Sequence, residues 1–133
     1  MCIRDRHIVD SFGSMKSKNV IKYISMMKQY LDESIIIGFH SYNNMQLSFS
    51  NATILLEQVD REVILDCSVH GIGIGAGNLN TEIILEYLNE NYQGQYNESS
   101  LMFNILLIMK SFMIQEVKIY MLISHGGILY LII

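Results

Sequence analysis

Residues 35–44 read IIIGFHSYNN, an apolar run that ends in a polar cluster, and this stretch decides the fold. Its β-branched start is typical of a strand buried on both faces, as in a parallel sheet. The same plan occurs in HIVDSFG at residues 7–13 and in EVILDCSVHGIGIGAGN at residues 62–78. In all three segments the polar or glycine-containing cluster lies at the carboxyl end of the expected strand.

A segment with helical periodicity follows each expected strand. Apolar residues recur at three- and four-residue steps within 17–31, 45–58 and 81–91, which is typical of amphipathic helices. Ser17 and Asn80 are the residue types that cap helix amino ends, so we expect them to cap the first and third helices.

The spacing of the polar clusters supports a repeated unit. The expected strand ends at Asp10, His40 and Asp66 lie 30 and 26 residues apart, close to the roughly 30 residues of a β-loop-α unit. Repeated units of this kind predict an α/β fold with a parallel sheet and right-handed crossovers.

The composition excludes several classes of protein. The chain has 133 residues, of which 50% are hydrophobic and 17% charged, and its net charge is −4. This length allows one domain, and a nucleic-acid binder would show a basic stripe that is absent here. The two cysteines, Cys2 and Cys67, form no disulfide framework, which favours a reducing cytoplasm. We expect Cys67 to be a buried, small apolar residue.

The two ends of the chain differ from its middle. Residues 1–6 (MCIRDR) look like a translated adapter or cloning scar, so the native part is expected to begin near His7, inside a strand. Residues 99–133 form an apolar tail that reads as a buried helix or as an out-of-frame stretch. Its run 121–133 has 13 residues, fewer than the roughly 20 that cross a bilayer, so membrane association is the weaker interpretation.

In parallel α/β folds the active site lies at the carboxyl ends of the strands, where all three clusters fall. His40 and Tyr42 are two residues apart, so they share a face about 6.6 Å apart and could point at one ion or substrate. A lone histidine at a strand end is also common as a hydrogen-bonded structural residue. The sequence leaves both interpretations of His40 open.

Asp66, Ser68 and His70 would share one face of the third strand, which suggests a serine-nucleophile triad. The span from Asp66 to His70 would be about 13 Å, well beyond hydrogen-bond reach. We therefore expect Asp66 and Ser68 to be inward-facing, hydrogen-bonded residues of a strand end.

The glycine-rich stretch 71–78 formally fits the pattern Gly-x-Gly-x-x-Ala. Such loops let backbone amides approach phosphate at a helix amino end, so a phosphate- or nucleotide-binding α/β module is an alternative function. The dinucleotide pattern also needs a second strand and an acidic residue about 20 residues further on, and the region near Asn97 offers no strand. Tight turns without a ligand would equally explain the glycines.

Three segments in order carry a resemblance to a known family: VDSFG at 9–13, IGFHSYNN at 37–44 and DCSVHGIGIGAGNLNTE at 66–82. They resemble the last three strands of the pyruvate carboxyltransferase or HMG-CoA-lyase-like family of metal-dependent TIM-barrel lyases, and aldolase-type members above all. The resemblance covers about residues 8–98. It implies that residues 7–98 are the C-terminal part, about the last three β-α units, of a (β/α)8 barrel.

The resemblance also implies a divalent metal ion (Mg, Mn or Zn). It places His40 at the first position of a metal-binding His-x-His pair and Asn78 at a further ligand position, while Tyr42 stands where the second histidine is expected. Asp10 and Ser11 match a strand-end position that faces the keto-acid substrate, and Gly73 and Gly75 belong to the loop that would bind its oxygens.

The implied chemistry makes or breaks a carbon–carbon bond through an enolate of pyruvate or of an acyl substrate. The family's first-strand aspartate and arginine have no counterpart in this chain, so no catalytic residue is assigned. We expect the chain by itself to be inactive. The implied partner is a small keto acid or acyl compound, with no nucleic acid or membrane, and the oligomeric state of the parent protein is left open.

Overall fold

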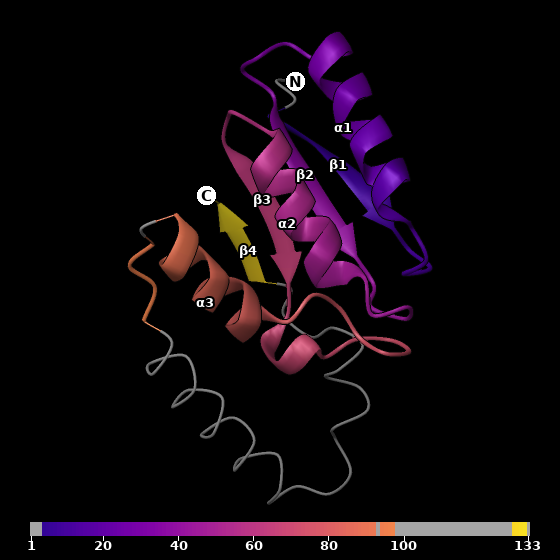
Figure 1. The fold of residues 1–133 in the computed structure, drawn as a ribbon, viewed down its shortest axis with the longest axis vertical. Coiled ribbons are helices and arrows are strands. Elements are labelled where there is room, and N and C mark those ends of the chain that lie inside the picture. Colours follow the sequence, from indigo (N-terminus) through magenta and orange to yellow (C-terminus); the bar gives the residue numbers. More distant parts are fainter. Residues whose placement is uncertain (1–3, 93, 98–128, 133) are drawn as a thin grey trace, which may run out of the picture.

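The computed structural model describes residues 4–92, 94–97 and the backbone of 129–132. Strands and helices alternate along the chain (Figure 1). Their bounds are β1 Asp5–Asp10, α1 Ser17–Tyr30, β2 Ile36–Ser41, α2 Ser48–Gln58, β3 Val63–Cys67, the 3-10 turn η1 Val69–Gly71, α3 Thr81–Asn91 and β4 Leu129–Ile132.

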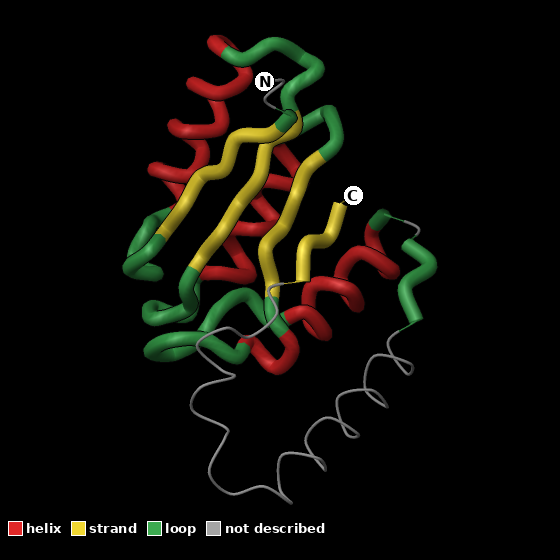
Figure 2. The backbone as a smooth tube through the Cα atoms, turned by 180° about the vertical axis from the view of Figure 1, so that it is seen from behind, coloured by secondary structure: helices red, strands yellow, loops and turns green. Residues whose placement is uncertain are grey.

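The sheet has the strand order β1-β2-β3-β4. The first three strands are parallel, and their register places Val9 beside His40 and His40 beside Asp66. The predicted α/β fold with a parallel sheet is therefore confirmed. Because neighbouring parallel strands end at the same edge, the three polar clusters meet there (Figure 2).

The fourth strand differs from the prediction. Residues 129–132 form β4, which runs antiparallel to β3 and pairs with residues 64–67. The interpretation of the tail as a buried helix is wrong for these four residues, because β3 offers an edge with which their backbone pairs. An antiparallel strand is also not part of a regular (β/α)8 barrel. The rest of the predicted tail, residues 99–128 and 133, lies outside the described residues.

The first strand starts earlier than expected. Asp5 and Arg6 pair with Ile36 and Ile37 in the parallel ladder, so the sheet begins two residues before His7. The origin of residues 1–6 stays a prediction, and residues 1–3 lie outside the described part of the chain.

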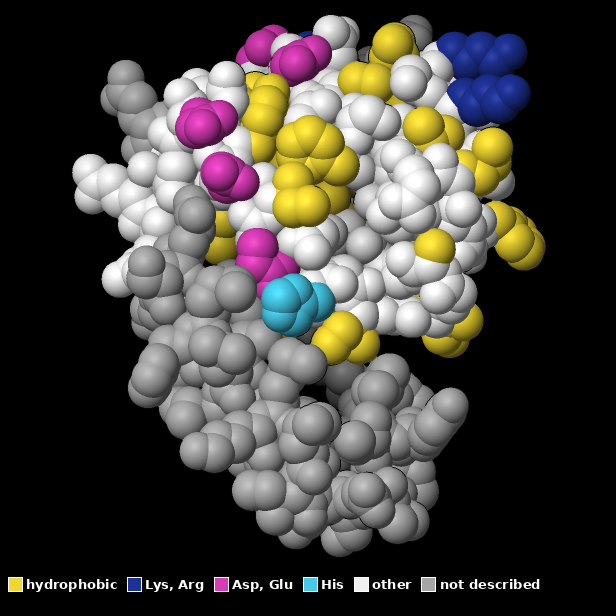
Figure 3. Space-filling model, turned by 60° about the horizontal axis from the view of Figure 1, so that its bottom comes forward, with side chains coloured by type: hydrophobic (Ala, Val, Ile, Leu, Met, Phe, Trp, Pro, Cys, Tyr) yellow, Lys and Arg dark blue, Asp and Glu magenta, His cyan; other side chains and the backbone are white. Residues whose placement is uncertain are grey.

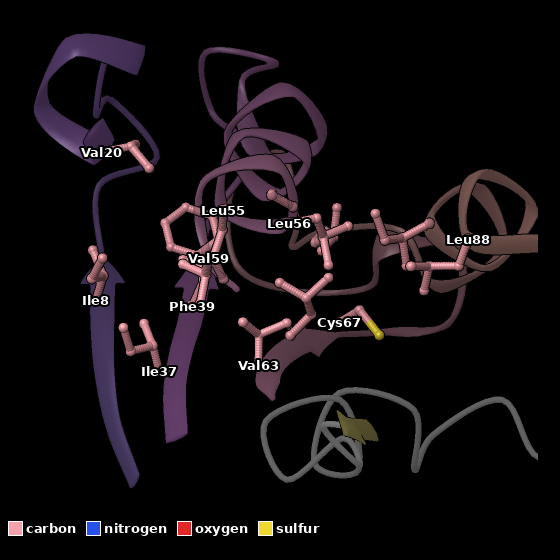
Figure 4. Packing of buried hydrophobic residues seen from close by; sticks show 14 of the residues in the cluster. Ile8, Val20, Ile37, Phe39, Leu55, Leu56, Val59, Val63, Cys67 and Leu88 are labelled. Atoms are coloured by element: carbon pink, nitrogen blue, oxygen red, sulfur yellow. The ribbon is translucent and has the colours of Figure 1, made fainter. Parts of the chain in front are cut away.

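The helices pack on one side of the sheet (Figures 1 and 2). Between them and the strands lies the hydrophobic core, in which Ile37, Phe39 and Leu65 are fully buried (Figure 4). Cys67 is buried in this core as predicted, and burial raises the pKa of its thiol. β2 and β3 are buried almost throughout, as their apolar runs indicate.

The helix bounds follow the sequence, with two corrections at the amino ends. α3 begins and is capped as predicted, since the Asn80 side chain accepts a hydrogen bond from the Ile83 amide. Ser17 does not cap α1. It is the first helical residue, and Lys16 occupies the cap position without a side-chain hydrogen bond.

None of the helices in the described part of the chain has both the length and the apolar character that a membrane span requires.

α2 begins three residues later than predicted, at Ser48. Residues 43–46 instead form a turn in which the Gln46 amide donates to the Asn43 carbonyl, with Gln46 at a φ of 58°. The Asn43 Oδ1 then accepts hydrogen bonds from the amide and the hydroxyl of Ser48. Two successive asparagines after a strand favour such a turn over a helix start.

Candidate functional site

Asp10 organises the turn between β1 and α1. Its two carboxylate oxygens accept hydrogen bonds from the amides of Ser14 and Met15, at 3.1 and 2.8 Å, and the residue is only 5% exposed. Ser11 beside it is exposed. A shallow hollow of about 310 Å³ is lined by Asp10, Ser11 and Tyr23 among others, but not by His40 or the glycine-rich loop. The predicted contact of Asp10 and Ser11 with a substrate stays a prediction.

Asn44 joins the loops that follow the three parallel strands. Its Nδ2 donates to the Phe12 carbonyl at 3.1 Å, and its Oδ1 accepts from the Ala76 amide at 2.8 Å. Met45 adds a backbone bond to Gly13. The side chain thus ties the β1 loop and the glycine-rich loop to the β2 loop. The sequence analysis assigned no role to Asn44, because its partners lie 32 residues away in both directions.

Tyr42 contacts each of the other two predicted metal ligands at this edge. The rings of His40 and Tyr42 contact each other edge to face, with centroids 5.4 Å apart. The backbone of Tyr42 forms an isolated antiparallel bridge with that of Asn78. The Nδ2 of Asn78 donates to the Ile72 carbonyl, while its Oδ1 is buried and has no hydrogen-bond partner in the described part of the chain.

These side chains fit a divalent ion only in part. The orphaned oxygen of Asn78 and an imidazole nitrogen of His40 are suitable donors. Tyr42 is a poor one, because a neutral phenol oxygen is a weaker ligand than an imidazole nitrogen or a carboxylate oxygen. Within the described residues no group of three His, Cys, Asp or Glu side chains could hold a metal ion. Residues outside the described part would have to complete any such site.

A second cluster, which the sequence analysis did not find, lies on the sheet face opposite the helices. The Asp66 Oδ2 lies 3.1 Å from the Nδ1 of His40 and 3.5 Å from the Nδ1 of His7. His7 reaches Asp66 across Gly38, its register partner, where a Cβ would overlap the imidazole ring. A glycine inside a strand indicates such a close approach, and this was the one available signal in the sequence.

The structure excludes the Asp66-Ser68-His70 triad, as predicted. The hydroxyl of Ser68 donates to the Ile72 carbonyl at 2.7 Å. His70 has left the strand and adopts a φ of 52°, and its amide donates to the Glu82 carboxylate. Asp66 and Ser68 are both buried and hydrogen-bonded at the strand end.

The glycine-rich loop is held by its own hydrogen bonds. Amides of residues 71, 72, 76, 77 and 78 donate to acceptors within the protein. Gly77 has a φ of +89°, and a Cβ there would overlap the Gly71 carbonyl. These five amides are occupied and Asn80 caps α3, so none of them is free to bind a phosphate. The alternative of a phosphate-binding loop stays a prediction.

Gly73 and Gly75 serve close packing in this loop. A Cβ on Gly73 would lie 2.6 Å from the Nδ2 of Asn78, and one on Gly75, which has a φ of +70°, would overlap the Oδ1 of Asn44. Both glycines therefore make room for the two asparagines that hold the site together. Their predicted contact with substrate oxygens stays a prediction.

Figure 3 shows the end of the molecule at which the parallel strands finish. Among the described residues, hydrophobic side chains are spread over this face, the acidic ones lie on its left half, and the visible Lys and Arg side chains gather mainly at the upper right corner.

Fold and site together define a class of protein. Three parallel β-α units, with polar side chains gathered at the carboxyl ends of their strands, are the arrangement of an α/β enzyme domain. The HMGL-like family matches residues 3–104, so the chain belongs to that family.

Relatives and solved structures agree with this membership. The chain is 37% identical over 84 residues to the 4-hydroxy-2-oxovalerate aldolase of Thermomicrobium roseum, a match that covers 63% of this chain and 22% of the relative. It is 34% identical over 83 residues to the enzyme of the same name from Geobacillus stearothermophilus, covering 62% of this chain and 23% of the relative. The matched part thus spans less than a quarter of these relatives.

A solved structure gives the same fold. A protein from Bacteroides vulgatus that is described as an aldolase, determined as its N-terminal domain, superposes with a TM-score of 0.72 at 26% identity. This match covers 85% of the present chain and 36% of the other chain.

Proposed function

We propose that this chain is part of an aldolase-type lyase, in which its three β-α units form the C-terminal part of a (β/α)8 barrel. The reaction would make or break a carbon–carbon bond of a small keto acid or acyl substrate through its enolate. The observation that supports this proposal is that Tyr42 contacts His40 by its ring and Asn78 by its backbone, beside the Asn44-linked loops, in a member of the HMGL-like family.

The residues of this chain would hold and orient the reactants. The two hydrogen bonds of the Asn44 side chain fix the three loops relative to one another. Groups on different strands therefore keep a constant separation. Ser11, exposed at the end of β1, would donate a hydrogen bond to a substrate oxygen. Asp10 would act indirectly, because its oxygens already hold the turn that presents Ser11.

His40 and Asn78 would be two of the ligands of a divalent ion such as Mg, Mn or Zn. When bound, such an ion acts as a Lewis acid toward the keto and carboxylate oxygens of the substrate.

We propose that a reducing, cytoplasmic compartment suits the buried Cys67 thiol. We also propose that the parent protein can form oligomers.

The substitution Tyr42→His tests the position of the metal site. It would place a second imidazole where the Tyr42 ring now contacts His40, and nitrogen ligands favour Zn²⁺. We expect the variant to bind Zn²⁺ at least ten times more tightly than the unchanged chain, measured by isothermal titration calorimetry.

The double variant Tyr42→His with His40→Ala is the matched control. It carries the new histidine but lacks the old one, so the gain in affinity should vanish. An equal gain in both variants would show that the new histidine binds zinc elsewhere, and the proposed site would then be wrong.

Activity tests the second part of the proposal. The 133-residue chain lacks a counterpart of the family's first-strand acid, so we expect it to release no pyruvate from 4-hydroxy-2-oxovalerate with Mn²⁺ present. Pyruvate release is followed by a coupled dehydrogenase assay. Turnover above that of the Tyr42→Phe variant would contradict the expected inactivity.

A further inference from the structure

We propose that Asp66 is a positioning residue that fixes the tautomer of His40. We also propose that His7, on β1, helps to hold the Asp66 carboxylate in place. The inference deepens the proposed function, since it concerns the imidazole that was assigned there to an ion. Asp66 and His7 themselves would not touch the ion or the substrate.

The hydrogen bond between the two strands determines where the imidazole proton lies. The Nδ1 of His40 is 3.1 Å from the Asp66 Oδ2, and an ionised carboxylate only accepts hydrogen bonds. In the neutral ring the proton must then be on Nδ1, which leaves Nε2 with a lone pair. Nε2 is therefore the nitrogen that can bind an ion or accept a proton. An outer carboxylate commonly orients a histidine ligand in this way.

The architecture of the sheet makes this pair rigid. His40 and Asp66 are register partners on adjacent parallel strands, so the separation of their backbones is set by the ladder. His7 reaches the same oxygen from β1, at 3.5 Å, and does so only because Gly38 has no side chain. The Asp66 carboxylate is consequently held from two strands.

Stability does not explain the presence of Asp66. Its side chain is 8% exposed, and its Oδ1 is buried with no hydrogen-bond partner among the described residues. A buried carboxylate with one unsatisfied oxygen weakens a fold compared with an apolar residue of similar size. A role in orienting His40 accounts for both the burial and the pairing.

The test measures the tautomer of His40 by nitrogen-15 NMR of the imidazole rings in the labelled full chain. The pH is held well above the ordinary imidazole pKa of about 6.5. We expect the form protonated on Nδ1 to predominate. Predominance of the form protonated on Nε2 in the unchanged chain would overturn the proposal, and this measurement requires no variant to fold.

The substitution Asp66→Asn supplies the second readout. Its amide can donate to Nδ1, which should switch His40 to the form protonated on Nε2, as asparagine in place of a triad aspartate selects the wrong tautomer. Asp60→Asn removes the same charge at an exposed position and should leave the tautomer unchanged. An unchanged tautomer in Asp66→Asn would also overturn the proposal.

Gly38→Ala tests whether His7 helps to hold the Asp66 carboxylate. The new methyl group would overlap the ring of His7 and so displace it. We expect the His7 signals to shift and the fraction of His40 protonated on Nδ1 to fall, because a carboxylate that is no longer held from β1 keeps its hydrogen bond to His40 for a smaller fraction of the time. If the ratio of the two His40 tautomers stays unchanged while the His7 signals shift, His7 does not hold the Asp66 carboxylate in place.

The two proposals fail separately. The NMR experiment uses neither metal nor substrate, so it decides the role of Asp66 even if Tyr42→His gains no zinc affinity. Conversely, a zinc site can form in Tyr42→His whichever nitrogen of His40 is protonated in the metal-free chain.

Discussion

Phe39 and His40 are neighbours on β2, yet they belong to opposite faces of the sheet. Phe39 is fully buried under the helices, together with Ile37 and Leu65, whereas His40 contacts Asp66 and His7 on the other face. Successive strand residues point to opposite sides. One strand therefore supplies stability through its odd-numbered residues and candidate chemistry through the even-numbered His40.

The largest expected loss of stability is on the face of the sheet that packs against the helices. Phe39→Ala removes a fully buried ring, and such truncations cost about 3–5 kcal/mol of unfolding free energy. Urea unfolding followed by circular dichroism measures the loss. Phe39→Leu, which keeps most of the volume, should cost about 1.5 kcal/mol or less. Equal losses in the two variants would show that the loss does not follow the volume removed from the core.

The next effect tests the loop that carries Asn78. Gly77→Ala combines a φ of +89° with an overlap between the new Cβ and the Gly71 carbonyl, so we expect a loss of about 2–4 kcal/mol. Gly73→Ala is the control, because its φ lies outside the left-handed region and its Cβ would lie nearest to the side chain of Asn78 and not to a backbone carbonyl. A thermal melt compares the two variants. If Gly73→Ala proves the more harmful, the loop is not held by its backbone as described.

A smaller loss of stability is expected at Asn44, whose side chain links the loops. Asn44→Ala removes hydrogen bonds to Phe12 and Ala76, at a cost of about 1–2 kcal/mol. Hydrogen exchange of the Ala76 amide should accelerate more than that of core amides. Asn91→Ala, which removes one bond within an exposed helix, should leave the Ala76 amide unchanged. Similar acceleration in both variants would contradict the role of Asn44.

The smallest effect is expected on the polar face. His40→Gln retains a donor for Asp66, so its unfolding free energy should change by about 1 kcal/mol or less. Chemical denaturation under the conditions used for Phe39→Ala gives a direct comparison of the two neighbours. A loss as large as that of Phe39→Ala would mean that both faces stabilise the fold equally, and the contrast between them would disappear.

Much of this arrangement was predicted from the sequence. Helical periodicity and strand runs are local patterns, so the order of the units, the bounds of α3 and its Asn80 cap were accessible. Ser17 failed as a cap because Asp10, from the preceding strand, organises the entry to α1 instead. The start of α2 shifted because the side chain of Asn43 favours a turn.

The sequence by itself determined which residues gather at the carboxyl edge of the sheet, since that follows from strand direction alone. Only the tertiary structure decided which of them touch. The pairing of His7, His40 and Asp66 depends on the register of three strands and on an absent side chain at Gly38. Register is set by the packing of the whole sheet on its helices, so residues 26 and 59 positions from Asp66 become its neighbours.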